Sequence, residues 1–393
     1  MKSPLVSLSA GLSAGLSAGL AAGVALAVPA AVAAAELPQQ LAWTAYGTTS
    51  SGYAQSVGIG NMLKNRHGVS LRVLPGKNDV SRMTPLKDGK ADMCACGIAS
   101  YFGSEGVMLF AKDGWGPQPI RVLLASMGSF GLGLATAKDA NVKTMSELKG
   151  KRVAWVRGGD ALNVNTEANL AFGGLTWDDV VKVEFPGFSQ SWEGLINDQV
   201  DAAFASTVTP LAKKLDASPR GIFWPPLPHG DKAAWGRFMK KAPYFVQHTA
   251  TAGAGMSKEQ PWEGAGYSYP ILVANAGYDS GVVHALVKAM VEGYDGYKDS
   301  APGAAGWALD RQNFDWVIPF HDGAVMYFKQ AGLWTDAMQK HNDMLVRRQD
   351  TLAKAWQSFK ASNPPGDEDE FAKAWMKVRA DALEGAGFDP VFK

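Results

Sequence analysis

The sequence predicts an α/β protein made of two lobes of like topology. Two observations support this prediction: one strand–loop–helix order occurs twice along the 393 residues, and apolar residues reach 47% against 19% charged residues. A chain of this length accommodates about two packed domains of ~100–200 residues each. Its 38 Lys and Arg nearly balance its 37 Asp and Glu, which argues against a nucleic-acid partner and against a disordered chain.

The first copy of the pattern covers residues 41–96. Its expected elements are strand 41–46, polar loop 47–52, helix 53–66 ended by Gly68, strand 69–74, a short helix that reaches Leu86, and strand 91–96. The glycines and hydroxyl residues of loop 47–52 separate an apolar run from a helical one, so this loop follows the carboxyl end of a strand.

The same order returns about 110 residues further along the chain. Its expected elements are strand 152–156, loop 157–163, helix 165–172, strand 181–185, a helix through 192–197, and strand 200–204. Leu86 lies six residues before Asp92, and Leu195 lies six residues before Asp201. Two occurrences at so long a period indicate a duplicated lobe, because solenoid repeats recur every ~20–50 residues.

The rest of the chain completes this organisation. A capping box of Thr144 and Glu147, followed by Gly150, predicts a short helix between the two copies. Strand 272–276 and helix 282–297 follow, and residues 335–393 have a charged helical pattern that 363–366 interrupts. The predicted parts are a first part of lobe 1 at 36–130, lobe 2 at 131–270, a return to lobe 1 with hinge-packing helices at 271–334, and a helical C-terminal extension at 335–393. The hinge crossings are expected near 128–134 and 265–275.

The first 35 residues have the features of a secretory signal peptide. A basic start at Lys2 precedes an uncharged stretch, and small residues at 31–35 fit a cleavage site before Glu36. The alternative is a membrane anchor, which the length of the stretch permits but its many Gly, Ser and Ala residues disfavour. We therefore expect a secreted, periplasmic protein.

Cys94 and Cys96 are the two cysteines of the chain. In an extended segment both side chains lie on one strand face, a geometry that suits a disulfide poorly. We expect two buried small residues in a core strand without a disulfide.

The candidate ligand site lies where the two copies meet. In α/β sheets, ligands bind beyond the carboxyl ends of strands, and a loop before a helix presents free N–H groups to an anion. Two facing loops of this kind suit a small carboxylate. The first loop contributes Gly47, Thr48, Thr49, Ser50 and Ser51, with Tyr53 at the helix start. The alternative role for these hydroxyls is helix capping.

The second loop contributes Arg157, Gly158, Asp160 and Asn163. A guanidinium at a strand end can hold a carboxylate through two parallel bonds, whereas the alternative is a surface arginine paired with Asp160. Two further strand ends add Tyr101, Ser206 and Thr207. Tyr101 either packs on the ligand or fills the core.

Motifs for catalysis and for metal binding were sought without success. The sequence contains no G-x-S-x-G elbow, no Walker loop and no G-x-G-x-x-G after a strand. Its six histidines form no H-E-x-x-H pattern and no cluster with cysteine. We expect neither enzyme activity, nor a cofactor, nor a metal ion.

The quoted residues resemble a known family over roughly residues 41–334. Gly-Thr-Thr-Ser-Ser-Gly-Tyr at 47–53, residues 86–92 and 142–153, and Ile-Pro-Phe-His-Asp-Gly-Ala at 318–324 with Gly-Leu-Trp at 332–334 are similar to the TAXI family. These are solute-binding subunits of tripartite ATP-independent periplasmic (TRAP) transporters. The resemblance implies a type II periplasmic-binding-protein-like clamshell that closes about a hinge.

The resemblance also implies a function and partners. Such a subunit captures a small carboxylate, such as glutamate, a dicarboxylate or an oxo acid, and delivers it to an ion-driven TRAP permease. We expect a monomer or a weak dimer. A periplasmic sensor that signals to a membrane protein is the alternative, and an enzyme on the same fold is a more distant one.

Overall fold

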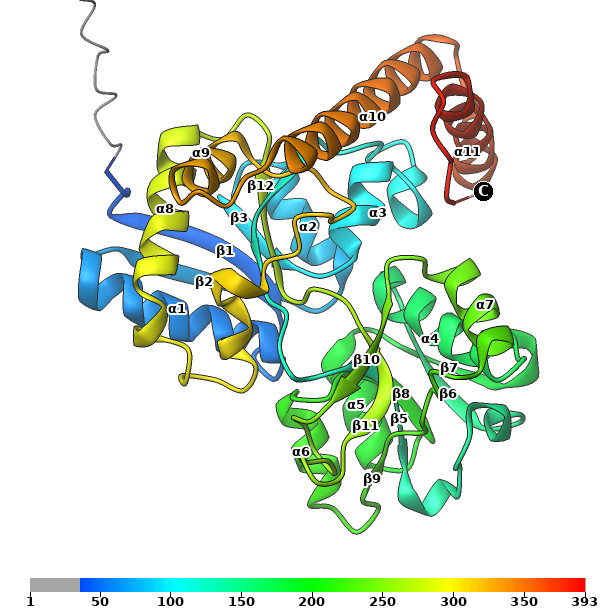
Figure 1. Ribbon diagram of the computed structural model, residues 1–393. Coiled ribbons are helices and arrows are strands. Elements are labelled where there is room, and N and C mark those ends of the chain that lie inside the picture. The colour runs from blue at the N-terminus through cyan, green and yellow to red at the C-terminus, as the bar shows by residue number, and fades with distance from the viewer. Residues whose placement is uncertain (1–35, 393) are drawn as a thin grey trace, which may run out of the picture. The chain divides into compact units, whose positions relative to one another are not determined.

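The computed structural model describes residues 36–392, which form two α/β lobes and a C-terminal pair of helices (Figure 1). The predicted two-lobed α/β fold with a helical extension is therefore confirmed. The predicted signal peptide and its cleavage site fall at residues 1–35, outside the described residues. Within 36–392, no helix combines the length and the apolar character needed to cross a bilayer.

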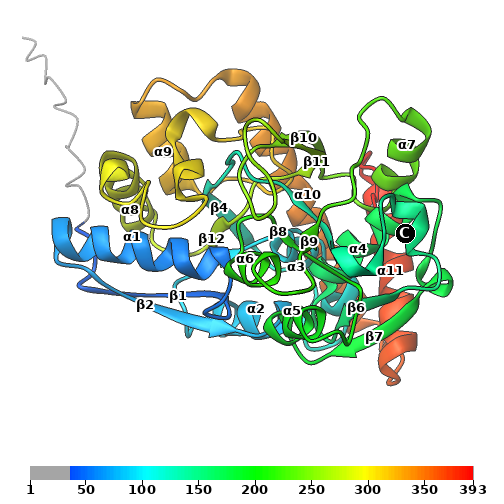
Figure 2. The same ribbon diagram turned by 90° about the horizontal axis from the view of Figure 1, so that it is seen from below.

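Lobe 1 is built on a five-stranded sheet in the order β2-β1-β3-β12-β4. Its strands are β1 (Gln40–Tyr46), β2 (Ser70–Gly76), β3 (Met93–Cys96), β4 (Ile120–Ala125) and β12 (Ile271–Asn275), and its helices are α1 (Ser51–His67), α2 (Asp79–Lys87), α3 (Ala99–Glu105), α8 (Ser280–Glu292) and α9 (Asp322–Gln330). β1 is parallel to β2 and β3, whereas β12 is antiparallel to β3 and β4. Figure 2 shows α1 and α8 side by side on one face of this sheet.

Lobe 2 repeats this arrangement in the order β7-β6-β8-β5-β9. Its strands are β5 (Leu132–Ala137), β6 (Arg152–Val156), β7 (Val181–Phe185), β8 (Ala202–Ser206) and β9 (Ile222–Phe223), and its helices are α4 (Asp160–Phe172), α5 (Phe188–Ile196), α6 (Pro210–Asp216) and α7 (Lys232–Lys241). β5 takes in lobe 2 the place that β12 has in lobe 1, antiparallel beside the third strand of the repeat. The topology therefore confirms the duplication seen in the sequence.

Short elements complete the described chain. An antiparallel ribbon of β10 (Val246–Ala250) and β11 (Trp262–Gly266) stands beside lobe 2. The 3-10 turns are η1 (Met108–Ala111), η2 (Lys138–Ala140), η3 (Met145–Leu148), η4 (Trp177–Asp179), η5 (Tyr294–Gly296), η6 (Ala304–Trp307) and η7 (Leu309–Arg311). The chain passes between the sheets at 126–131 and at 267–270. The finer lobe boundaries stay a prediction.

An aspartate joins the first and third strands of each repeat in the same way. The Asp92 carboxylate accepts a hydrogen bond from the Ala42 amide at 2.7 Å, and the Asp92 amide donates to the Ala42 carbonyl at 2.9 Å. Asp201 makes the same two bonds with Arg152, both at 2.8 Å. The six-residue spacing found in the sequence thus marks a structural motif that both lobes share.

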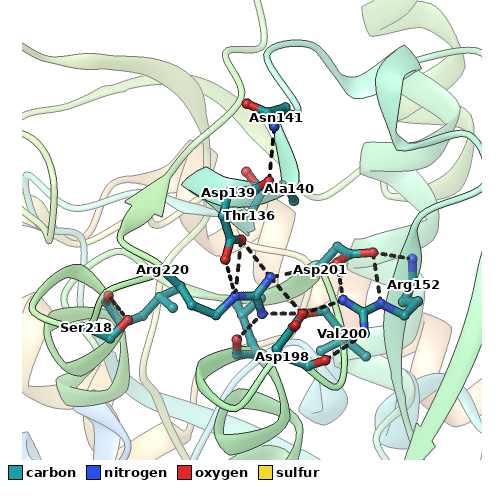
Figure 3. A network of polar contacts seen from close by, with 12 residues as sticks. Thr136, Asp139, Ala140, Asn141, Arg152, Asp198, Val200, Asp201, Ser218 and Arg220 are labelled. Carbon is teal, nitrogen blue, oxygen red and sulfur yellow. Dashed lines mark hydrogen bonds and ion pairs between the residues drawn. The ribbon is translucent and has the colours of Figure 1, made fainter.

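In lobe 2 this motif extends into an ion-pair network (Figure 3). Arg152 binds both Asp198 and Asp201, and Arg220 binds Asp139 through two nitrogens. Although burial opposes ionisation of Asp201, its hydrogen bonds from Arg152 hold its pKa below the usual range. The network fixes the starts of β6 and β8 against the turn before β9, at the end of the sheet away from the strand carboxyl ends.

The C-terminal extension consists of α10 (Asp336–Ala361) and α11 (Glu368–Gly385), which pack on each other and on lobe 1. Glu105, at the end of α3, is only 2% exposed, and its carboxylate accepts hydrogen bonds from Arg348 at 2.7 and 2.8 Å and a further bond from Arg379. The Trp375 indole donates to the carbonyl of Gly106 at 2.6 Å. Two buried cations and one buried anion therefore attach the extension to α3.

Three local expectations need correction. The structure joins Cys94 and Cys96 in a disulfide, contrary to the predicted free pair: their Cα atoms lie 5.1 Å apart, inside the range of about 4.4–6.8 Å that disulfides use. The segment predicted as a short helix near Thr144 is a 3-10 turn, η3, although its capping box forms. The helix predicted over 282–297 ends at Glu292, and a separate turn, η5, follows.

The buried cluster gives a stability prediction. Replacing Glu105 by Gln leaves the guanidinium groups of Arg348 and Arg379 buried without an anion, so we expect the free energy of unfolding to fall by about 3–5 kcal/mol. Denaturant titration followed by circular dichroism measures it. Lys377→Gln, which removes an exposed pair with Asp381 on α11, serves as the control and should leave the midpoint unchanged. Equal midpoints for Glu105→Gln and the parent protein would contradict this account of the extension.

Candidate functional site

A small cavity of about 30 Å³ lies between the lobes, at the carboxyl ends of strands from both sheets. It has room for one or two water molecules. Its polar lining residues are Tyr46, Ser50, Ser51, Arg82, Asn165, Ser206, Thr209, Tyr267 and Tyr269, and its bulkier apolar ones are Ile98, Leu132, Leu162, Phe188 and Phe204. A wider groove lies between α10 and residues 386–391, but the buried cation in it, Arg348, is already paired with Glu105.

Arg82, on α2, is the charged group of this cavity. Its side chain is fully buried, and its guanidinium lies 3.4 Å from the centroid of the Tyr46 ring. One nitrogen, Nη2, donates to Asp79 at 2.6 Å, whereas Nε and Nη1 are buried without any hydrogen-bond partner. Because an unpaired buried donor on a charged group is costly, these two nitrogens indicate a ligand that accepts hydrogen bonds.

Asp79 holds Arg82 in place and also links the lobes. Its Oδ1 accepts from the Tyr46 hydroxyl at 2.6 Å and from Arg82, and its Oδ2 accepts from the Ala161 amide at 2.8 Å. Ala161 lies in the first turn of α4, where an anion is favoured by the free N–H groups and the helix dipole. Burial opposes the charge on Arg82, but Tyr46 and Asp79 on balance raise its pKa, so the guanidinium stays protonated.

Hydroxyl groups from both lobes complete the polar lining. The Ser206 Oγ, at the end of β8, is a further buried polar atom without a hydrogen-bond partner. Ser50 caps α1 by accepting from the Tyr53 amide at 3.2 Å, while Ser51 bonds to the Tyr269 hydroxyl. The cavity therefore combines one cation with neutral donors and acceptors.

Direct hydrogen bonds hold the two lobes together around the cavity. The Leu109 amide of lobe 1 donates to Asp160 of lobe 2 at 2.8 Å, which mirrors the bond from Ala161 to Asp79. Thr49 contacts Ser189 through their hydroxyls at 2.8 Å. The lobes are thus closed on each other in this structure.

The structure brings only part of the predicted first loop to the cavity. Ser50 and Ser51 line it, whereas Gly47, Thr48 and Thr49 do not. Thr48 is exposed, and Thr49 bonds across the lobes, since its carbonyl also accepts from the Thr209 hydroxyl at 3.2 Å. Tyr53 is half-buried on α1, outside the cavity.

The second loop lies beside the cavity and contributes none of the predicted contacts. Arg157 is 74% exposed and pairs with Glu184 on the neighbouring strand, so the structure does not bring its guanidinium to the cavity. Gly158, with a left-handed φ of +69°, accepts from the Asp79 amide through its carbonyl at 2.9 Å. Asn163 bonds both the amide and the carbonyl of Val156. The four predicted residues of this loop therefore lie outside the cavity lining, to which the loop contributes Ala161 and Leu162.

The remaining predicted residues divide between the cavity and the core. Ser206 lines the cavity, whereas the neighbouring Thr207 bonds Ala252 and Gly131 beside a crossing. Tyr101 lies on α3 and is buried, with its ring 5.5 Å from that of Phe392. It therefore fills the core, the second of its two predicted roles. Of the predicted site residues, Ser50, Ser51 and Ser206 reach the cavity.

Arg82 and Asp79 were not among the residues predicted from the sequence. The residues that α2 buries are Asp79, Arg82, Met83 and Leu86. Their spacing of i, i+3, i+4 and i+7 is that of an apolar helical stripe. An Asp–Arg pair that occupies two such positions is the sequence signal that points to a buried polar site.

Among residues 36–392, no group of three or more His, Cys, Asp and Glu side chains is placed to hold a metal ion. The cavity itself presents hydroxyl, amide and guanidinium groups. Hard divalent cations prefer oxygen anions, which this lining does not offer. The arrangement suits an organic anion.

Comparison with known proteins gives a family and several distant structural likenesses. The sequence pattern of the NMT1-like family matches residues 44–332. An alkanesulfonate-binding protein from Xanthomonas axonopodis pv. citri, bound to MOPS, is 16% identical with a TM-score of 0.44, covering 83% of this chain and 94% of its own. An arginine-bound amino acid substrate-binding protein from Streptococcus pneumoniae is 11% identical with a TM-score of 0.39, covering 79% and 96%. A glutathione-bound periplasmic binding protein from Brucella ovis is 9% identical with a TM-score of 0.42, covering 64% and 66%.

The contact between Asp160 and Leu109 predicts a dependence of stability on pH. Burial is the largest cause that raises the pKa of Asp160, to about 6, and the negative charge of Asp79 raises it further. The hydrogen bond from the Leu109 amide and the positive charge of Lys112 both lower this pKa. A folded-state pKa above the unfolded value of about 3.9 means that folding takes up a proton between about pH 4 and 6. The contribution of Asp160 is therefore most favourable at pH 4 and declines as the pH rises through 6.

Asp160→Asn removes this titration. We expect the stability difference between Asp160→Asn and the parent protein to move in favour of the variant by roughly 1–3 kcal/mol from pH 4 to pH 7. Denaturant titrations at four pH values measure it, and Asp178→Asn, an exposed site on lobe 2, controls for the lost charge. A difference that stays constant with pH would show that Asp160 does not titrate in this window.

Proposed function

The chain belongs to the NMT1-like family, and from this premise we propose that it captures a small carboxylate in the periplasm and presents it to a membrane permease. In its finer form the proposal is a TAXI-type binding subunit of an ion-driven TRAP transporter, secreted through cleavage of residues 1–35. Its action is binding and release, without chemical turnover of the solute.

The observation that carries the proposal is the pair of unpartnered nitrogens on Arg82. Nε and Nη1 are buried on a residue that lines the cavity, and Nη2 of the same guanidinium donates to Asp79. The N–H groups of Nε and Nη1 do not share an edge of the planar guanidinium, so a carboxylate accepts from one of these two nitrogens, through a short, charge-assisted bond. A carboxylate would therefore satisfy one of the two unpaired donors.

Binding in this site couples to closure of the lobes. Arg82 belongs to lobe 1, and Ser206, whose Oγ is also unpartnered, belongs to lobe 2. A ligand that contacts both residues favours the closed arrangement by its differential affinity for it. The two crossings at 126–131 and 267–270 are the segments about which the lobes would turn. A permease that prefers the closed form would then receive loaded protein.

The proposal predicts that Arg82 dominates affinity. A thermal-shift screen of acetate, propionate, pyruvate, succinate, 2-oxoglutarate and glutamate selects the probe, because excess ligand raises the apparent stability. For that probe, Arg82→Met should weaken binding roughly 10- to 100-fold, since hydrogen bonds to a charged group contribute about 1.5–3 kcal/mol. Calorimetric titration measures the affinity.

Two further variants make this test specific. Arg157→Met removes an exposed guanidinium outside the cavity and should leave the affinity unchanged. Ser206→Ala should weaken binding only a few-fold, because it removes one neutral hydrogen bond. Undiminished binding by a folded Arg82→Met protein, or a loss confined to Arg157→Met, would place the carboxylate elsewhere.

A further inference from the structure

Granted that the proposed function holds, we propose that the site selects short monocarboxylates that lack an ammonium group, such as 2-oxo and 2-hydroxy acids, over the corresponding α-amino acids. The charges that the cavity presents account for this selection. Among its lining residues, all of which lie in the described chain, Arg82 is the one side chain with a formal charge. A ligand carboxylate has a partner there, and a ligand cation has none.

Asp79, which bonds Arg82, and Asp160, which precedes Ala161 in the chain, are committed to other partners. Asp79 accepts from Tyr46, Arg82 and the Ala161 amide, and Asp160 accepts from the Leu109 amide. Neither belongs to the cavity lining. An ammonium group would lose its hydration without gaining an anion, which costs several kcal/mol, and it would also lie near the Arg82 cation.

The neutral polar groups suit an uncharged oxygen beside the carboxylate. Ser206, Tyr267 and Tyr269, which carry hydroxyl groups, line the cavity, and the Asn165 amide donates to the Tyr267 hydroxyl at 3.1 Å. Hydroxyl groups can donate to a carbonyl oxygen or exchange bonds with a hydroxyl. A 2-oxo or 2-hydroxy group is therefore accommodated without any net charge.

The lack of a second cation disfavours a second carboxylate. The rings of Tyr46, Phe188 and Phe204 line the cavity. A dicarboxylate would place its second anion against these rings without a second cation. The same reasoning disfavours glutamate, which carries both an ammonium and a second carboxylate.

The experiment compares acids that differ only in the group at C2. Calorimetric titration of the purified protein at pH 7.5 with pyruvate and alanine, and with 2-oxobutyrate and 2-aminobutyrate, should show the oxo acid binding at least 10-fold more tightly in each pair. Succinate and 2-oxoglutarate should bind more weakly than pyruvate. Equal or tighter binding of the amino acids, or a preference for the dicarboxylates, overturns the selection.

A variant of almost unchanged shape tests the physical cause. Asn165→Asp places a negative charge in the cavity wall, and the Tyr267 hydroxyl can donate to it in place of the lost amide. We expect the ratio of oxo-acid to amino-acid affinity to fall at least 5-fold in this variant, and an unchanged ratio overturns the charge argument. If no carboxylate binds either protein, the proposed function itself fails, which distinguishes this outcome from a reversed preference among acids that do bind.

Discussion

The carboxylate of Asp79 is the interaction on which the rest of the site depends. It orients the Arg82 guanidinium, accepts from the Tyr46 hydroxyl, and receives the Ala161 amide from the other lobe. Removing any one of these donors would leave part of a buried anion unsatisfied, and that constraint keeps the three groups together. The position of the cation and the closure of the lobes are therefore set by the same group, so a motion of the lobes necessarily changes the surroundings of Arg82.

The two lobes share a topology but differ where the cavity forms. The second helix of the repeat is α2 in lobe 1, which presents Asp79 and Arg82, and α5 in lobe 2, which presents Phe188. The Phe188 ring lies 5.4 Å from that of Tyr46, on whose face Arg82 is stacked. Lobe 1 thus provides the charge, and lobe 2 provides an aromatic cover, beside which polar contacts are stronger than they are in water. The two lobes therefore share a backbone arrangement, and the polar site arises from side chains that differ between them.

Local patterns in the sequence predicted the strands, the helices and the duplication, because apolar periodicity and capping are encoded by near neighbours. The positions of Ser50 and Ser51, in the turn from β1 into α1, and of Ser206, at the end of β8, were also predictable, because both places lie at the carboxyl edge of a sheet. Arg157 also follows the end of a strand. In the structure, however, Trp155 on β6 pairs with Glu184 on β7, which brings the Glu184 carboxylate beside Arg157. The register between two strands cannot be predicted from the sequence of one strand. Arg82 was missed because a lone arginine in a helix normally indicates the solvent face. The Cys94–Cys96 bond depends on a local strand geometry that spacing alone does not specify.

The C-terminal extension explains why Tyr101 belongs to the core rather than to the cavity. A carboxylate such as Glu105 at the carboxyl end of a helix is disfavoured by the helix dipole, and Arg348 and Arg379 offset this from outside the lobe. The chain end then places Phe392 5.5 Å from the rings of both Tyr101 and Phe102. Phe102 lies in turn 6.0 Å from Tyr244, a residue of lobe 2. The extension therefore packs on the wall of lobe 1 against which lobe 2 closes, and Tyr101, five positions beyond the end of β3, becomes part of that wall.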